Sequence, residues 1–250
     1  MATRFYLVIN TPADVTPPAV LAGWGHSVDS VRKLVTTPDS STLANIGYSP
    51  DASDHIIDTN ACHRRCVSDP LAAQTLSGNI TAQIQCLELR ASNNMFLALA
   101  VRVISNDGTT VRNESLGVTR ATSLEISTTL TNRTFPSTSI GSFACASGDR
   151  ILIELGVGGL PTAVGGSPDG HNAQIRAGMN ASSGDLPVNE TETGTTFRGW
   201  IEFSNTFTFQ GAEEFDAALM AAMNRPWPDI IFQKSKVVAS GMKPSNAVNN

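Results

Sequence analysis

The sequence contains few charged residues and no cluster of basic ones. Asp, Glu, Lys and Arg make up 16% of the 250 residues, and the formal net charge is -5. Because nucleic-acid phosphates are bound by grouped Lys and Arg side chains, this composition argues against a nucleic-acid partner. Long hydrophobic runs are also lacking, and no segment approaches the length of a transmembrane span, so we expect no membrane partner.

Cysteines are few, and a secretion signal is not apparent. The apolar run at residues 5–9 is shorter than the core of a signal peptide, and polar residues follow it. We therefore expect the chain to be made and folded in a cytoplasm, where its four cysteines are thiols.

The most strand-like run spans residues 94–106 and organises the rest of the sequence. Its apolar residues alternate between the two faces of a pleat, with Arg102 as the single charge among them. A strand that is apolar on both faces is buried on both faces, so this one should lie in the middle of a layered β structure. One face carries Met95, Leu97, Leu99, Val101 and Val103, and the other carries Phe96, Ala98, Ala100 and Ile104.

About eight to ten strands at short spacing, without alternating helices, indicate an all-β fold. We predict an antiparallel β-sandwich of jelly-roll type, with one C-terminal helix and extended terminal arms. A polar segment at 91–94 and an Asp-Gly pair at 107–108 predict hairpin turns before and after the central strand. Further strands are expected at 4–9, 28–35, 56–67, 76–90, 111–118, 124–130, 150–155, 172–179 and 200–209, with residues 156–199 otherwise mostly loop.

The sequence divides into three parts. Residues 1–25 read as a short strand and a proline-rich extended arm, residues 26–209 as the β-sandwich domain, and residues 210–250 as a helix and extended tail. The helix is expected at 211–224, where apolar residues recur at helical spacing and prolines follow. Its apolar stripe consists of Phe215, Ala218, Leu219, Ala222 and Met223.

Two groups of residues carry metal-ligand chemistry. Cys62, His63 and Cys66 are zinc-type ligands, but their spacing is one residue longer than the usual knuckle. On a regular strand both cysteines would also face one side as small hydrophobic residues. Asp185 and Glu190 lie in an oxygen-rich loop that could bind calcium, although acidic loops are more often only solvated. We predict no metal and no cofactor.

Carboxylates and aromatic rings in predicted strands suggest two further kinds of site, a glycoside-hydrolysing site and a sugar-binding surface. Two facing carboxylates could hydrolyse a glycoside, but nothing in the local sequence pairs them and no G-x-S-x-G elbow is present, so we predict that the protein is not an enzyme. Exposed Tyr48 and Trp200 rings could stack on a sugar, although most aromatic residues in strands belong to the core. The carboxylates concerned are Glu88, Glu125, Glu154 and Glu202.

Six segments stand out in order along the chain. They are MATRFYL at the start, SDPLAAQTLSG at 68–78, VISNDGTTVR at 103–112, TTLTNRTFP at 128–136, GDRILIELG at 148–156, and SSGDLPVNETETG followed by GWIEFS within 182–204. Together they resemble a family of mostly uncharacterised proteins of tailed bacteriophages and prophages. The resemblance covers most of residues 1–209 and implies a virion structural protein with a β-sandwich domain.

The resemblance also implies a location and partners. We expect a virion component made in the host bacterial cytoplasm. It would be a decoration or cement protein of the capsid or, alternatively, a tail fibre, neck or baseplate component or a glycan- or receptor-binding module. Its expected partners are the major capsid protein or tail proteins, and further copies of the chain in a homo-oligomer such as a trimer. Trp24 should anchor in a core or in a neighbour. The expected interface residues are Trp24, Phe215, Leu219, Met223, Trp227 and Phe232.

Overall fold

The computed structural model describes residues 2–27, 30–38, 42–48, 59–91, 94–122, 124–159, 173–178 and 183–211. The chain divides into a compact unit, Met1–Phe209, and a second unit, Gln210–Asn250. Beyond Gly211 the second unit lies outside the described residues. The expected helix and tail therefore fall there, together with Phe215, Leu219, Met223, Trp227 and Phe232. No helix in the described part of the chain is long and apolar enough to cross a membrane.

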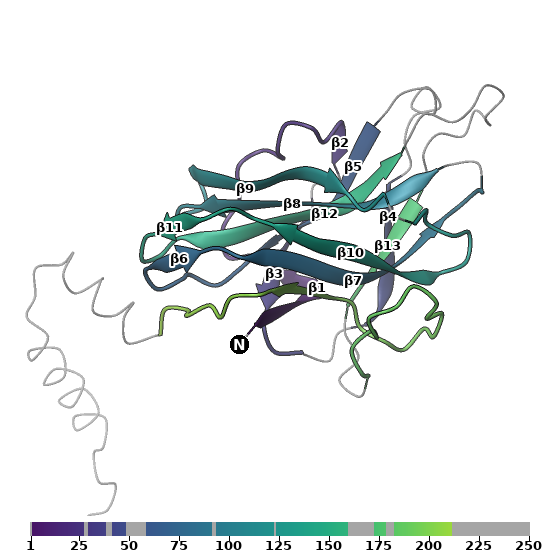
Figure 1. The fold of residues 1–250 in the computed structure, drawn as a ribbon. Helices are drawn as coiled ribbons and strands as arrows, with labels where there is room; N and C mark the ends of the chain where they lie inside the picture. The colour runs from purple at the N-terminus through teal and green to yellow at the C-terminus, as the bar shows by residue number, and fades with distance from the viewer. Residues whose placement is uncertain are drawn as a thin grey trace, which may run out of the picture. The chain divides into compact units, whose positions relative to one another are not determined.

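The described residues form an all-β structure, as predicted. Twelve strands make one sheet in the order β4-β13-β7-β14-β1-β3-β5-β12-β8-β9, with β10 beside β7 and β2 beside β5, and β11 and β6 make a separate pair (Figure 1). The sheet is mixed and not purely antiparallel, because β2 and β3 run parallel to β5. The strands are β1 Thr3–Pro12, β2 His26–Ser27, β3 Val31–Val35, β4 Ala44–Tyr48, β5 Thr59–Val67, β6 Gln74–Leu76, β7 Asn79–Glu88, β8 Met95–Ile104, β9 Val111–Arg120, β10 Thr131–Ser139, β11 Phe143–Cys145, β12 Arg150–Gly159, β13 Ala173–Ala177 and β14 Trp200–Phe203.

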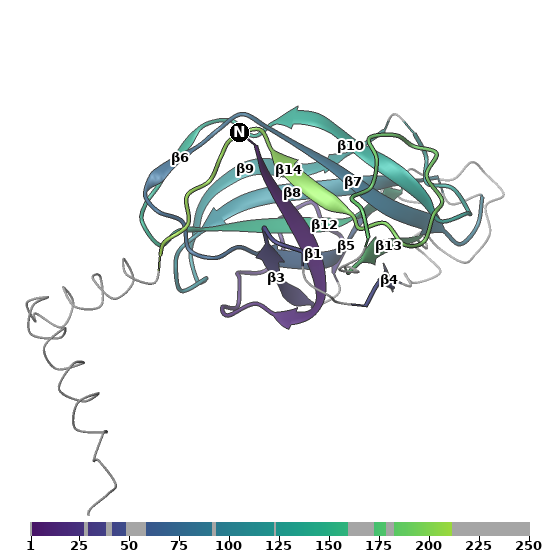
Figure 2. The same ribbon diagram turned by 90° about the horizontal axis from the view of Figure 1, so that it is seen from below.

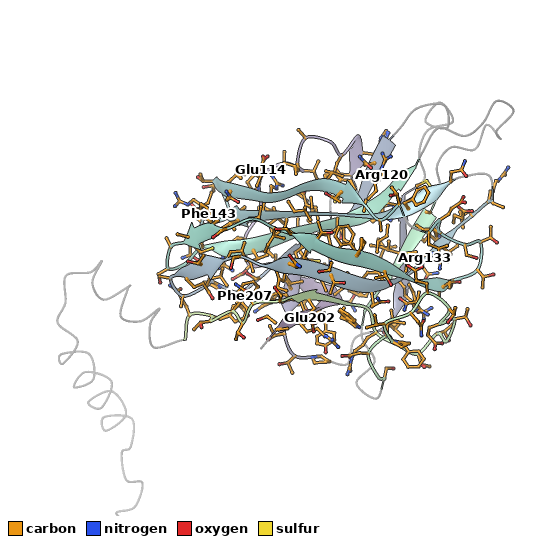
Figure 3. The ribbon with its side chains drawn as sticks, in the orientation of Figure 1. Glu114, Arg120, Arg133, Phe143, Glu202 and Phe207 are labelled. Atoms are coloured by element: carbon orange, nitrogen blue, oxygen red, sulfur yellow. The ribbon has the colours of Figure 1, made fainter. Side chains whose placement is uncertain are left out.

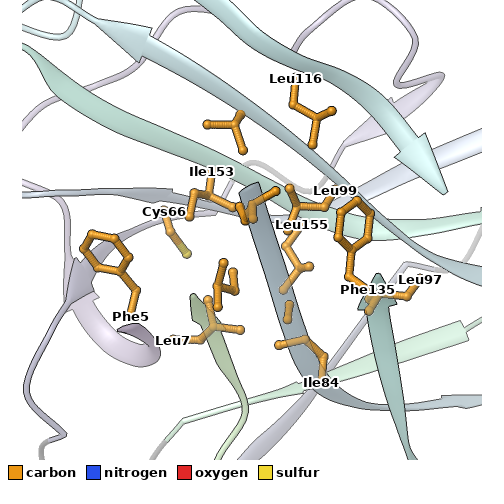
Figure 4. Packing of buried hydrophobic residues seen from close by; sticks show 14 of the residues in the cluster. Phe5, Leu7, Cys66, Ile84, Leu97, Leu99, Leu116, Phe135, Ile153 and Leu155 are labelled. Carbon is orange, nitrogen blue, oxygen red and sulfur yellow. The ribbon is translucent and has the colours of Figure 1, made fainter. Parts of the chain in front are cut away.

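The large sheet curls so that both of its halves contribute to one core. Strands β8 and β12 lie above β7 and β10 in Figure 1, and β1 joins the halves by pairing with β14 on one side and β3 on the other (Figure 2). Inward side chains of both halves meet in the main hydrophobic cluster (Figure 4). Among its buried members are Phe5, Leu7, Ile84, Leu97, Leu99, Phe135, Ile153 and Leu155.

Strand β8 is buried along its whole length, which confirms the prediction for the central strand. One face lies in the main cluster. The other face is covered by residues 13–25, which we call the N-terminal strap. The proline-rich segment expected as an arm therefore lies against the chain's own sheet. The apolar contacts group Leu21 and Trp24 with Ala98 and Ala100, and Ala13 and Val15 with Ile104.

Of the two predicted hairpins, one is confirmed and one is wrong. Strands β8 and β9 pair across a turn in which Gly108 has a φ of 78° and the Ser105 N–H donates to the Thr110 carbonyl at 2.9 Å. Strand β7 instead pairs with β10, β13 and β14, whereas β8 pairs with β12 and β9. The polar segment 91–94 thus connects the two halves of the sheet. Because β8 is apolar on both faces, a central place in the opposite half suits it.

Three other strand predictions are corrected. The described residues of 124–130 form no strand and belong to a crossover, residues 121–130, between β9 and β10. Strand β10 was not predicted, because Pro136 interrupts its pattern. This proline lies at a register shift on an edge strand, where the missing N–H is tolerated. The last strand ends at Phe203, although Phe207 and Phe209 still pack on the ring of Phe5.

Strand β12 continues through Gly159, a stretch that the sequence predicts as loop. Gly156 lies opposite Cys62 at a register shift, where His63 is an extra residue on β5. Such a bulge bends the strand locally. Here it brings the Ala61 carbonyl to the place that a side chain at position 156 would occupy.

Replacing Gly156 with Ala is therefore expected to lower the free energy of unfolding by about 1–3 kcal/mol through overpacking. Urea denaturation monitored by fluorescence measures this change. Gly117→Ala on edge strand β9 is the matched control, because a Cβ there meets nothing within 4 Å. Equal losses in the two variants would show that crowding at the bulge is not the cause.

Candidate functional site

A buried ion pair lies between the sheet and the N-terminal strap. Arg102 of β8 donates a charge-assisted hydrogen bond to Glu154 of β12, and their side chains are 3% and 0% exposed. The Leu21 N–H and the Trp24 indole Nε1 donate to Oε2 of Glu154 at 3.1 and 2.8 Å. Arg102 also donates to the Ala19 carbonyl at 2.8 Å. The pair therefore joins two sheet strands to the strap.

This arrangement gives Arg102 and Glu154 a structural role. A buried carboxylate needs a counter-charge and hydrogen bonds to offset its lost hydration, and Glu154 has both. A second ion pair, from Arg150 to Asp14 at 3.0 Å, fixes the beginning of the strap. Glu154, considered above as a catalytic acid, is enclosed by these donors. Trp24, expected at an interface, is only 7% exposed and lies in the chain's own core.

Cys62, His63 and Cys66 are not brought together as a ligand set. The bulge at His63 places Cys62 in the cluster beneath the strap, whereas Cys66 lies in the main core, so the expectation that both cysteines face one side was wrong. Burial raises the pKa of both thiols to about 12 and lowers the pKa of His63 to about 4. Within the described ranges, no group of three or more His, Cys, Asp and Glu side chains could hold a metal ion.

Asp185 and Glu190, the calcium candidates, both have protein partners. Burial alone would raise the pKa of Asp185, but hydrogen bonds from Arg198, Arg4 and a tyrosine hydroxyl outweigh it and lower the pKa. Glu190 accepts a hydrogen bond from a backbone N–H of β10 at 3.2 Å. These carboxylates therefore fasten the loop before β14 to strands β1 and β10.

Trp200 does not offer a stacking face for a sugar. Its ring is 2% exposed, its Nε1 donates to the Leu186 carbonyl at 2.9 Å, and the Arg4 guanidinium lies 4.0 Å from the ring centroid. The side chain of Tyr48 lies outside the described residues. Glu202, labelled in Figure 3, pairs with Arg4 at 2.8 Å on the partly exposed outer side of β14.

Glu125 lies near enough to Glu88 for its negative charge to act on that carboxyl group, a proximity that the sequence does not reveal. Glu88 ends β7 and is 3% exposed. Burial, and next the negative charge of Glu125, raise the pKa of Glu88 to about 7. The Met95 N–H and the charge of Arg133, which is labelled in Figure 3, oppose this rise. The sequence signal was missing because a strand, and not a crossover, is predicted at 124–130. Glu154 and Glu202 have other partners, so the glutamates do not assemble into one site.

No protein-family model matches the sequence, and no curated protein matches it at a significant level. Among solved structures, an aminopeptidase of the marine sediment archaeon Thaumarchaeota archaeon is similar with a TM-score of 0.40 and 12% identity, over 69% of this chain and 35% of that one. The sugar-binding C-terminal domain of EclA is similar with a TM-score of 0.21 and 12% identity, over 56% and 78% of the two chains.

A chain of the T13 infectious bursal disease virus particle has a TM-score of 0.25 and 11% identity, over 76% of this chain and 49% of that one. The chain spans about a third of the archaeal aminopeptidase. These similarities are too slight to carry a functional argument.

Proposed function

We propose that the protein is a structural component of a tailed-bacteriophage virion and acts as a decoration or cement protein of the capsid. The supporting observation is the division of the chain at Phe209. A compact all-β unit is followed by residues 210–250, whose sequence carries an apolar stripe at helical spacing and two further aromatic residues, Trp227 and Phe232. The finer fold assignment in this proposal is a jelly-roll sandwich for the compact unit.

The proposed mechanism is burial of surface between subunits. The body is made rigid by a core that spans both halves of its sheet and by a strap held by one buried ion pair, Arg102–Glu154, and one partly exposed ion pair, Arg150–Asp14. The apolar stripe would be buried on the major capsid protein or on a further copy of the chain. Each large apolar side chain that is fully buried contributes about 1.5–3 kcal/mol, so a few such residues stabilise a shell contact.

Leu219→Asp with Met223→Asp is expected to reduce shell binding at least tenfold, because two charges would have to enter an apolar contact. Full-length protein is mixed with purified, undecorated phage shells, and the bound fraction is measured by co-sedimentation. Ala217→Asp with Ala221→Asp is the matched control, since it adds the same charge off the stripe. We expect it to bind as the wild type does.

Light scattering on the same variants tests the self-association that the proposal includes. If the wild-type chain binds neither shells nor phage tails and remains a monomer, the proposal fails. Binding to tails alone would place the protein in the fibre, neck or baseplate.

A further inference from the structure

Strands β3 and β5 carry two arginines on the face that turns toward the main hydrophobic cluster. Arg64 of β5 pairs with Leu155, and this leucine lies in that cluster. Arg32 of β3 pairs with Cys66, which lies there too. Residues paired across neighbouring strands share a face of the sheet, and so do residues two apart on one strand. Arg32 and Arg64 are therefore diagonal neighbours on the inner face.

The guanidinium of Arg64 is enclosed but only partly hydrogen-bonded. The residue is 4% exposed, and its Nη1 donates to Oγ of Ser30 at 3.0 Å. Its Nε is buried and has no hydrogen-bond acceptor among the described residues. The Nε and Nη2 groups form one edge of the guanidinium, and such an edge donates two parallel hydrogen bonds to a carboxylate or a phosphate. The contact with Ser30 occupies the other side and leaves this edge for a further acceptor.

Neither arginine forms an ion pair with a carboxylate of the described residues. Arg32 is partly exposed, and its Nε donates to the Ile9 carbonyl at 2.6 Å. Its Nη1 donates to the Val31 carbonyl at 2.9 Å. Both arginines are thus held by neutral oxygen atoms, so two positive charges lie side by side and one of them is removed from water.

Two other buried arginines show what such a charge requires. Arg102 pairs with Glu154, and Arg150 pairs with Asp14 at 3.0 Å. A charge that is removed from water destabilises the fold unless a counter-charge and hydrogen bonds offset its lost hydration. A water molecule would accept the Nε–H of Arg64 but would leave its charge unbalanced. An anion at the same place does both.

We propose that Arg64 and Arg32 form a binding site for a small oxyanion, either a carboxylate or a phosphate group. The Nε and Nη2 edge of Arg64 would hold two of its oxygen atoms, and Arg32 would supply the second positive charge. Ser30 orients the edge by holding Nη1, and Ser30 and Arg32 are partly exposed, so the site borders on solvent. The proposal does not depend on the capsid role, which rests on residues 210–250.

The site is tested by NMR on full-length protein that carries ¹⁵N-labelled arginine. Inorganic phosphate and, separately, acetate are added at constant ionic strength. We expect the Nε–H resonance of Arg64 to shift and to saturate with at least one probe, because this group has no acceptor among the described residues. A response to phosphate alone defines a phosphate site, a response to acetate alone defines a carboxylate site, and a response to both defines a general oxyanion site. An unchanged resonance with both probes, or the same change with sodium chloride, would overturn the proposal.

Variants at the two arginines test the geometry of the site. Arg64→Lys keeps the positive charge but lacks the planar edge, so we expect it to bind the active probe about tenfold or more weakly, as measured by isothermal titration calorimetry. Arg32→Gln should also weaken binding. Lys33→Gln is the matched control, because it removes the same charge from the opposite face of β3, where Lys33 pairs with Asp69 at 2.7 Å. Undiminished affinity in Arg64→Lys, or equal losses in Arg32→Gln and Lys33→Gln, would contradict the proposed site.

Discussion

Replacing Glu154 with Gln is expected to lower the free energy of unfolding by about 3–5 kcal/mol, the usual cost of breaking a buried ion pair from one side. Glutamine can still accept hydrogen bonds from Leu21 and Trp24, but it leaves the guanidinium of Arg102 buried without a counter-charge. Because domains are stable by only about 5–15 kcal/mol, this loss is a large fraction of the total stability. Urea denaturation of the full-length chain measures the loss.

Glu202→Gln is the matched control for this result. It removes the same charge from a pair with Arg4 whose side chains are 33% and 27% exposed. Such pairs contribute about 1 kcal/mol or less. Arg102→Met alone leaves the Glu154 carboxylate buried without a counter-charge, whereas in the Glu154→Gln background it removes the last unpaired charge, so it should cost far less stability there. If Glu154→Gln and Glu202→Gln lose equal stability, the buried pair does not fix the strap.

The place of β8 could be predicted from sequence because its signal is local. Apolar residues on both faces of one run specify a strand covered on both sides, and the structure bears this out. Arg102 was also visible as the single charge in that run. Its partner, Glu154, could not be predicted, because β8 and β12 are paired in space but separated by some fifty residues of sequence.

The short strands, the bulge at His63 and the surroundings of Glu88 could not be predicted, because they depend on pairing between residues far apart in the sequence. Strands β4, β6 and β11 have only three to five residues and gain their structure from their neighbours. The bulge at His63 reverses the side of the sheet to which Cys62 points, and the alternation of apolar and polar residues gives no sign of this bulge. The proximity of Glu125 to Glu88 depends in the same way on a crossover whose sequence resembles a strand.

Replacing His63 with Leu is expected to remove a large part of the acid sensitivity of the protein. His63 is fully buried, and its ring nitrogens make no hydrogen bond of normal geometry with described residues. Burial lowers the pKa of its imidazole, and the nearby Ile46 backbone only partly opposes this lowering. The pKa of His63 thus falls from 6.5 to about 4. The unfolded chain binds this proton more readily, so stability falls as the pH drops from 6.5 toward 4, by at most about 3 kcal/mol.

Glu88 acts in the opposite direction over the same pH range, because its raised pKa favours the folded protein in acid. The measurement is therefore made in the Glu88→Gln background, by urea denaturation between about pH 7 and pH 4. With Glu88 neutralised, the chain carrying His63 should lose stability across this range, whereas His63→Leu should stay nearly constant until Asp185 is protonated at still lower pH. His26→Leu, at a partly exposed position on β2, should keep the acid dependence. If His63→Leu retains the full loss, the buried imidazole is not its source, and the acid sensitivity must come from the carboxylates.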